Sequence, residues 1–315
     1  LTGLCQFHND KEPSFVITPS KNLWHCLGAC QTGGTVIDFV MKAEGVSFRH
    51  AVEILRHGVK RGGQVRKVAR IRILPSPVDL DADDETALSQ VIEYYHETLK
   101  ISGLALESLA KRGIKNEEAI DRFRIGYSNR TLGLRMPEKN RQAGLKIRER
   151  LERLGLLRES GHEHFSGSAV FPILDLGGKI LGVYGRKIND HLRPGTPHHL
   201  YLPGPRKGIW NPEGAQGEEV ILCEAIIDAL TFWVNGIRNV TASYGVNGFT
   251  DDHLAAFKAG GVKRVYIAYD RDDAGDKAAA TLAPRLIAEG FECVRVLFPL
   301  NMDANEFALA SDPPD

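Results

Sequence analysis

Four side chains suited to metal binding lie close together near the start of the chain. Cys5 and His8 are separated by two residues, and Cys26 and Cys30 are separated by three. Thiolates and an imidazole in two such pairs are typical of tetrahedral zinc, and a shell filled by four protein ligands indicates a structural site. The five cysteines are an odd number in a chain that we expect to be cytoplasmic, which disfavours disulfides. We therefore expect structural Zn²⁺ at these four residues, with His25 as an alternative ligand.

A second group of chemically competent side chains is acidic and lies near the other end of the chain. Glu224 ends the apolar run EEVILCE, and Asp270 and Asp272 follow the run RVYIAY. Asp228 comes one helical turn after Glu224, and Asp303 follows the last apolar run. Ligands of an open parallel sheet bind beyond the carboxyl ends of its strands. We expect these acids to meet there.

Grouped carboxylates raise one another's pKa values unless a cation neutralises them, and oxygen ligands favour Mg²⁺ or Mn²⁺. Two such ions could activate an attacking hydroxyl and stabilise a leaving pyrophosphate oxygen. The alternative for a single aspartate at a strand end is a helix cap or a solvated loop residue, and we expect that of Asp273 and Asp276.

The elements around these residues predict an α+β multidomain protein. Residues 1–58 contain the hairpin SFVITPSKNLWHC and two helices, the second capped by Ser47, and residues 59–85 have the glycine, proline and charge content of a linker. Residues 86–216 combine helices with the strands SAVFPILD and KILGVYGRKI in an α+β segment. Residues 217–315 alternate strands with helices, which predicts an α/β segment with a mostly parallel sheet.

The formal net charge is zero, but the charges are unevenly distributed. Residues 1–75 carry 11 Lys and Arg against 5 Asp and Glu, whereas residues 217–315 carry 8 against 16. A basic N-terminal part and an acidic C-terminal part suit a protein that binds a polyanion with the first and metal ions with the second. The alternative is random variation of the surface charge. No apolar run is long enough to span a bilayer, so we expect no membrane partner.

The order of the motifs CxFHxxKxPSF, HCxGxC and DFVM, followed by E-x3-D and D-x-D-x-A-G, resembles the bacterial DnaG-type DNA primases over nearly the whole chain. The resemblance implies a CHC2 zinc finger of zinc-ribbon type in residues 1–58. It further implies the N-terminal subdomain of a primase RNA-polymerase core in residues 86–216 and a Toprim subdomain in residues 217–315. The implied activity is nucleotidyl transfer that makes short RNA primers on single-stranded DNA from ribonucleoside triphosphates.

The resemblance also implies roles for individual residues. Glu224, Asp270 and Asp272 would be the metal-binding catalytic acids, supported by Asp228 and Asp303. Basic residues facing the template or nucleotide would be Arg186 and Lys187 in YGRK and Lys207 in PRKG. From the residues themselves, an exposed Trp24 with Lys21 and Arg49 would suit nucleic acid, the alternative being that Trp24 packs against the hairpin.

The chain departs from the family pattern at several positions. Ser166-Gly167-Ser168 replaces an Arg-x-Arg pair, Glu224-Ala225 replaces Glu-Gly, Asp270-Arg271-Asp272 replaces Asp-Gly-Asp, and Asp303-Ala304-Asn305 replaces the last acidic pair. Arg271 is expected to recover one phosphate contact. The chain ends soon after the Toprim-like segment, so we expect a fragment or a divergent primase of phage or mobile-element type. It would lack the family's usual helicase-binding domain, although a replicative helicase is a possible partner. A Toprim metal-dependent nuclease and a non-catalytic single-stranded DNA binding module are the alternative functions.

Overall fold

The computed structural model describes residues 1–46, 48, 51–52, 54–55, 75–137, 139, 141–189 and 191–311. The chain divides into two compact units. Unit 1 consists of Leu1–Ala87 and Asn129–Ser166, and unit 2 of Leu88–Ser128 and Gly167–Asp315. Arg49, the Ser47 cap and most of the predicted linker and second helix lie outside the described residues. No helix within the described ranges is both long and apolar enough to cross a membrane.

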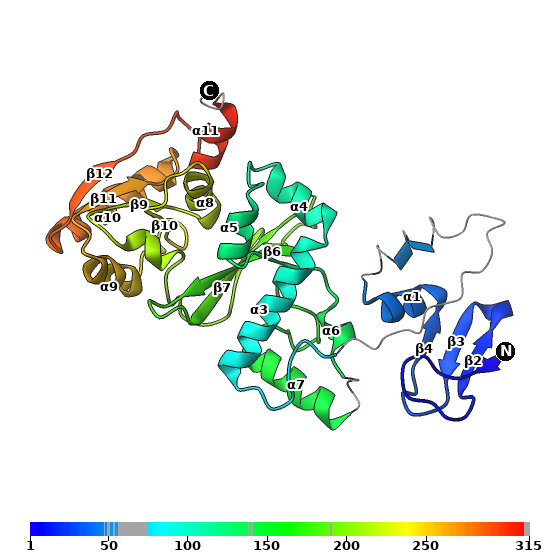
Figure 1. Cartoon of the computed structure of the whole chain (residues 1–315). Helices are drawn as coiled ribbons and strands as arrows, with labels where there is room; N and C mark the ends of the chain where they lie inside the picture. Colours follow the sequence, from blue (N-terminus) through cyan, green and yellow to red (C-terminus); the bar gives the residue numbers. More distant parts are fainter. Residues whose placement is uncertain are drawn as a thin grey trace. The chain divides into compact units, whose positions relative to one another are not determined.

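The start of unit 1 is a small antiparallel sheet with one helix, coloured blue in Figure 1. Its strands, in spatial order, are β1 (Thr2–Gly3), β2 (Phe15–Thr18), β3 (Leu23–Cys26) and β4 (Gly33–Thr35). β2 and β3 form the predicted hairpin, with the 3-10 turn η1 (Pro19–Lys21) between them. Helix α1 (Val36–Glu44) begins at a capping box of Thr35 and Asp38 and ends at Gly45, whose φ is 63°.

The core of this small sheet is aromatic. Trp24 stacks on Phe15 with ring centroids 5.2 Å apart, and Phe7 and Phe39 complete the cluster. The Trp24 side chain is only 6% exposed, and its indole N–H donates to the Thr35 carbonyl at 3.0 Å. The prediction that Trp24 is exposed for nucleic-acid contact is therefore wrong, because a small sheet has few other large side chains with which to build a core. The alternative, packing against the hairpin, is correct.

The first part of unit 2 is an antiparallel sheet flanked by helices. Its strands, in spatial order, are β5 (Gly126–Ser128), β6 (Ser168–Leu174), β7 (Ile180–Lys187) and β8 (His199–Tyr201). The helices are α3 (Asp84–Lys100), which begins in unit 1, α4 (Gly103–Ala110) and α5 (Glu117–Arg122). Unit 1 contains α6 (Leu132–Arg135) and α7 (Gln142–Arg153). β6 and β7 are the two strands predicted on either side of the Gly177-Gly178 turn.

The second part of unit 2 is the predicted parallel sheet. Its strands, in spatial order, are β10 (Val240–Ala242), β9 (Glu219–Cys223), β11 (Arg264–Ala268) and β12 (Glu292–Arg295), and every neighbouring pair is parallel. The helices are α8 (Ile226–Val234), α9 (Asp251–Gly260), α10 (Asp273–Ala288) and α11 (Ala304–Ala310). The short turn η2 (Pro212–Ala215) precedes β9. The predicted fold class is confirmed.

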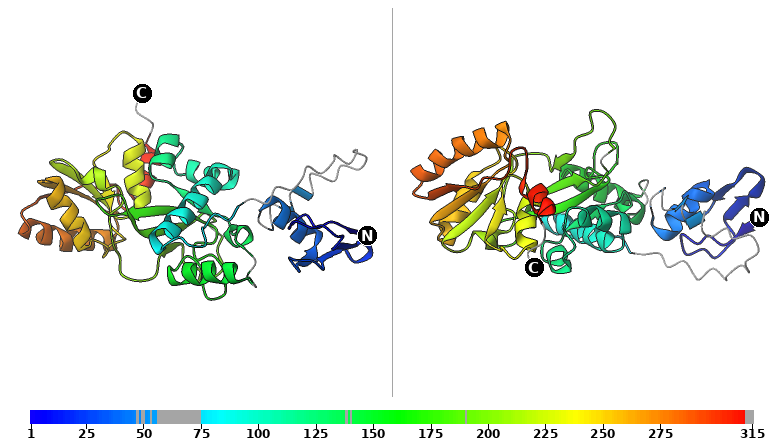
Figure 2. Two further views of the ribbon diagram at one scale, coloured as in Figure 1. Left: turned by 60° about the horizontal axis from the view of Figure 1, so that its bottom comes forward. Right: turned by 90° about the horizontal axis from the view of Figure 1, so that it is seen from above.

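Both faces of the parallel sheet are covered, which explains why its strands are continuously apolar. Leu222 belongs to the core beneath α9 and α10, together with Phe257 and Leu286. The next residue along β9, Cys223, points to the opposite face and joins the core that contains α8. Figures 1 and 2 show these helices around the yellow and orange strands. α8 shares its hydrophobic core with β6 and β7.

Candidate functional site: a Cys/His cluster and an acidic cluster

The four predicted zinc ligands come together. Their ligand atoms all lie within 4.8 Å of one another, in the one such group that the described residues contain. The Cys5 and Cys30 sulfurs are 3.6 Å apart, and the Cys26 sulfur is 3.9 Å from His8 Nδ1. Ligand atoms about 2.3 Å from a central zinc ion in a tetrahedron are about 3.8 Å apart, so the observed spacing fits zinc. His25, the alternative ligand, is exposed and is not a member of this group.

The surroundings of the cluster also suit bound metal. The backbone N–H groups of Phe7 and Gly28 point at the Cys5 and Cys26 sulfurs, at 3.4 and 3.3 Å. Hydrogen bonds from Ser14 and the Gly28 N–H lower the pKa of Cys26, whereas burial raises the pKa of Cys5, so without a cation only one of these two thiols is disposed to ionise and a bound metal would be needed to hold both as thiolates. Asp10 lies 3.3 Å from His8 Nε2 and so orients the ring with Nδ1 toward the cluster.

The predicted acidic residues lie at the carboxyl edge of the parallel sheet. Cys223 and Ala268 are partners at the ends of the adjacent strands β9 and β11, so the residues that follow each strand emerge side by side. Glu224 directly follows β9, and Asp270 and Asp272 lie in the loop between β11 and α10. The strand-end argument therefore placed these three acids correctly.

The loop after β11 is held against the first turn of α10. The Asp272 side chain caps this helix, because its Oδ1 accepts the Gly275 N–H at 2.7 Å. A Cβ on Gly275 would lie 2.3 Å from the Asp270 carbonyl oxygen, so only glycine allows the helix to approach this closely. Asp303 caps α11 in the same way, accepting the Glu306 N–H at 2.6 Å. Each cap uses one carboxylate oxygen and fixes its side chain.

Burial and neighbouring negative charge raise the pKa values of two of these acids. Burial raises the pKa of Glu224 to about 7, and the charges of Asp270 and Asp272 contribute. Burial, followed by the charges of Asp303 and Asp272, raises the pKa of Asp270 to about 6. Glu224 Oε2 is buried and, among the described residues, has no hydrogen-bond partner. An unpaired carboxylate oxygen beside other acids is the arrangement that a hard cation would stabilise.

The carboxylates nevertheless do not converge as tightly as the zinc ligands. In the described part of the chain, the Cys/His group is the one set of side chains whose ligand atoms already lie close enough together to hold a metal ion. Asp228 is buried, accepts the Asn305 N–H at 3.3 Å, and has a pKa raised well above its usual value by burial and by Asp303 and Asp270. Asp228 is therefore a buried neighbour of these acids, held by the backbone of α11.

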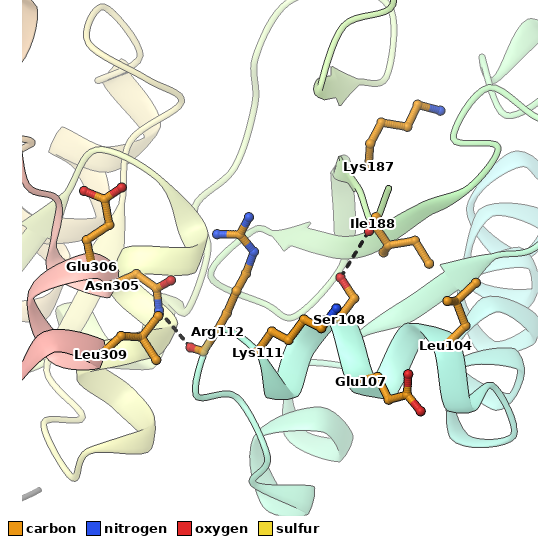
Figure 3. A pocket seen from close by; sticks show the side chains of 10 residues that line it. All are labelled: Leu104, Glu107, Ser108, Lys111, Arg112, Lys187, Ile188, Asn305, Glu306 and Leu309. Carbon is orange, nitrogen blue, oxygen red and sulfur yellow. Dashed lines mark hydrogen bonds between the residues drawn. The ribbon is translucent and has the colours of Figure 1, made fainter. Parts of the chain in front are cut away.

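The three predicted basic residues have different surroundings in unit 2. Arg186, near the end of β7, is close enough to Asp228 for its charge to lower the pKa of that carboxyl. Lys187 lines a cavity of about 260 Å³ formed by α4, the end of β7 and α11 (Figure 3). Arg112 extends from the end of α4 into this cavity. Lys207 is exposed in the loop after β8.

Sequence reasoning missed a group beside the acidic cluster. Arg295 in β12 bonds to the loop after β11, and Asp276, predicted as a cap or solvated residue, pairs with both Arg295 and Arg271. The contact of Arg271 with Asp276 also differs from the expected phosphate contact. A lone arginine within the apolar run CVRVLFP was the available signal, because a charged group in a strand needs a partner.

Three family profiles match the chain in sequence order. They are described as CHC2 zinc finger (residues 1–69), DNA primase catalytic core, N-terminal domain (residues 94–199), and Toprim-like (residues 221–308). Curated relatives include the DNA primase of Aquifex aeolicus, 31% identical over 96% of this chain and 59% of the relative. Another is the DNA primase of Enterococcus faecalis, 29% identical over 97% of this chain and 51% of the relative. The chain thus spans between half and three fifths of these relatives' length.

Solved structures are similar over the same regions. A crystal structure of the zinc-binding and RNA polymerase domains of Aquifex aeolicus primase has a TM-score of 0.61 and 29% identity, covering 97% of this chain and 74% of the other. A DnaG primase catalytic domain bound to single-stranded DNA has a TM-score of 0.55 and covers 69% of this chain and 74% of the other. At 22% identity, the second comparison shows a common fold only.

Proposed function

Because the chain belongs to the DnaG-type DNA primase family, we propose that it synthesises short RNA primers on a single-stranded DNA template from ribonucleoside triphosphates. The observation that carries the proposal is the acidic cluster at the carboxyl edge of the parallel sheet, where Glu224 has a buried, unpaired oxygen and a pKa of about 7. The DNA primases to which the chain is similar support the choice of template.

Glu224, Asp270 and Asp272 would hold Mg²⁺ or Mn²⁺, because hard divalent ions prefer carboxylate oxygens. Bound divalent ions would supply activation of the primer 3′-hydroxyl and neutralisation of the leaving pyrophosphate. The fold holds the side chains of these acids in place. Asp272 is immobilised by its cap on α10, and Asp228 is buried behind the cluster.

Phosphate binding is assigned to the basic residues near the acids. Arg186 combines a position beside Asp228 with a guanidinium that can contact two phosphate oxygens at once. Lys187 and Lys207 add charge on the same unit. The Cys/His cluster, with four protein ligands, would hold Zn²⁺ in a structural role, since no coordination position is left for substrate.

The test is a primer-synthesis assay with single-stranded template, labelled ribonucleotides and Mg²⁺ or Mn²⁺. We expect short RNA products from the unmodified chain and none from Asp270→Ala, which should unfold at a similar temperature. Asp251→Ala is the matched control, because Asp251 is an exposed acid at the start of α9 that pairs with Arg285. Synthesis retained by Asp270→Ala would refute the site. Shortened template would indicate the nuclease, and a mobility shift alone would indicate the binding module.

A further inference from the structure

Arg295 holds together the end of the strand that carries Asp270. Its guanidinium donates to the carbonyl oxygens of Ile267, Tyr269 and Asp270, at 3.1, 2.8 and 2.9 Å. It also donates to Asp276 Oδ1 at 2.9 Å. The Arg295 side chain is only 22% exposed. An exposed ion pair contributes little to structure, but a guanidinium shared by three carbonyls and a carboxylate fixes the backbone of this loop.

Arg271 is a positively charged residue in the loop that carries the proposed metal ligands. It lies between Asp270 and Asp272, and its backbone is paired with the loop before Asp303 through Met302 and Asn301. A guanidinium in this position could bind the neighbouring carboxylates in two-point contacts and compete with a divalent ion.

Asp276 binds the Arg271 guanidinium instead. Its Oδ2 accepts a hydrogen bond from Arg271, while its Oδ1 accepts from Arg295. Both arginines lower the pKa of Asp276, with Arg271 the larger influence, so the acceptor is ionised at neutral pH. Arg271 thereby lies in the wall of a groove of about 440 Å³ beside α10, together with Asp276 and Arg295.

We propose that Asp276 and Arg295 are positioning residues for the acidic cluster: Arg295 fixes the loop that carries Asp270 and Asp272, and Asp276 holds Arg271 away from their carboxylates. The proposal rests on the proposed function in that it takes these carboxylates as divalent-ion ligands. The proposal gives Arg271, Asp276 and Arg295 a role in metal affinity, whereas a purely structural ion pair would affect the stability of the fold alone.

The test measures Mn²⁺ binding by the electron paramagnetic resonance signal of the unbound ion, using the zinc-loaded full chain. Asp276→Asn should weaken Mn²⁺ binding by about tenfold, the order expected when a group that orients metal ligands is lost. Adding Arg271→Ala to Asp276→Asn should restore binding to within about threefold of the unmodified chain, because the competing guanidinium is gone. Arg285→Gln is the control, since Arg285 is on the same helix and pairs with Asp251 and the Phe249 carbonyl.

A second readout needs no divalent ion. The N–H groups of Arg271 and Asn301 donate across the two loops, to Met302 and Arg271 respectively. Arg295→Gln should speed hydrogen exchange at both amides severalfold, and Arg285→Gln should not.

Unchanged Mn²⁺ affinity in Asp276→Asn, or a double variant no better than the single one, would overturn the positioning role. If Glu224→Gln leaves Mn²⁺ binding of the otherwise unmodified chain unaltered, the proposed metal site itself is wrong. Hydrogen exchange then decides the remaining question: faster exchange in Arg295→Gln supports the positioning of the loop, and equal exchange refutes it.

Discussion

Replacing Glu224 by glutamine should stabilise the protein above neutral pH when no divalent ion other than zinc is present. One carboxyl oxygen is buried without a hydrogen-bond partner among the described residues, and the charges of Asp270 and Asp272 add to the effect of burial, although the Asp270 backbone partly offsets it. Ionising this carboxyl therefore costs free energy in the folded state that it does not cost in the unfolded chain. Glutamine keeps the shape of the side chain and removes the charge.

The size of this difference in unfolding free energy follows from the pKa of Glu224. A rise from 4.5 to about 7 means that the folded state favours the protonated form. Protonated Glu224 does not destabilise the folded state, so the stability of the unmodified chain is fully present below pH 4.5 and is lost as the pH rises through about 7, where the carboxyl ionises in the folded state. At about 1.4 kcal/mol per pKa unit, the upper limit is about 3 kcal/mol. Glu224 is only half-buried, and water screens its charge, so we expect an advantage of about 1–2 kcal/mol for Glu224→Gln at pH 8, about a quarter of that at pH 5 and none at pH 3.

The assay is urea unfolding followed by tryptophan fluorescence in a Trp24→Phe background. This leaves Trp210 and Trp233, both in unit 2, as the reporters. Adding Mn²⁺ should make the unmodified chain more stable than Glu224→Gln, because the ion binds and stabilises the unmodified chain and not the variant. Equal stabilities of the two proteins at pH 8, or a variant that is less stable there, would refute the argument from desolvation and like charge.

Three further changes test other parts of the structure. Cys26→Ser should abolish zinc binding, measured by atomic emission, and leave the unfolding of unit 2 unaltered; full zinc content would contradict the ligand assignment. Burial lowers the pKa of His253 to about 4, so unit 2 should lose stability as the pH falls from 6.5 toward 4, and His253→Gln should flatten that part of the pH profile. Gly275→Ala should destabilise unit 2 by about 1–3 kcal/mol in urea unfolding, because the added Cβ would meet the Asp270 carbonyl.

Features with a local sequence signal were predictable. The ligand pairs around Cys5 and Cys26 and the turn between β2 and β3 each depend on a few neighbouring residues. The parallel sheet followed from alternating apolar runs, and its carboxyl edge located Glu224 and Asp270. In each case the signal lies in a short stretch of sequence, and a general rule of zinc ligation or of parallel sheets brings the separate stretches together.

The burial of Trp24 was also available from the sequence. Alternate residues of a strand share a face, and Cys26 must face the metal. Trp24, two residues earlier, faces the same side, while Leu23 and His25 are exposed. For the group of Asp276 and Arg295, the lone arginine in the apolar run indicates that a partner is needed but does not identify it, because the partner lies on a helix 19 residues earlier.

Asn305 shows why a departure from the family pattern need not affect the chemistry that the pattern implies. Its amide Nδ2 donates to the Arg112 carbonyl and to Thr231 Oγ1, each at 2.8 Å, while its backbone N–H donates to Asp228. The Thr231 hydroxyl already donates to the Ile227 carbonyl, so its oxygen can only accept from Asn305. An aspartate here would direct a carboxylate at two acceptors, close to the buried carboxyl of Asp228. The amide is therefore the group that the packing of α11 against α8 requires, and of these two positions only Asp303 carries a charge that acts on Asp228 and Asp270.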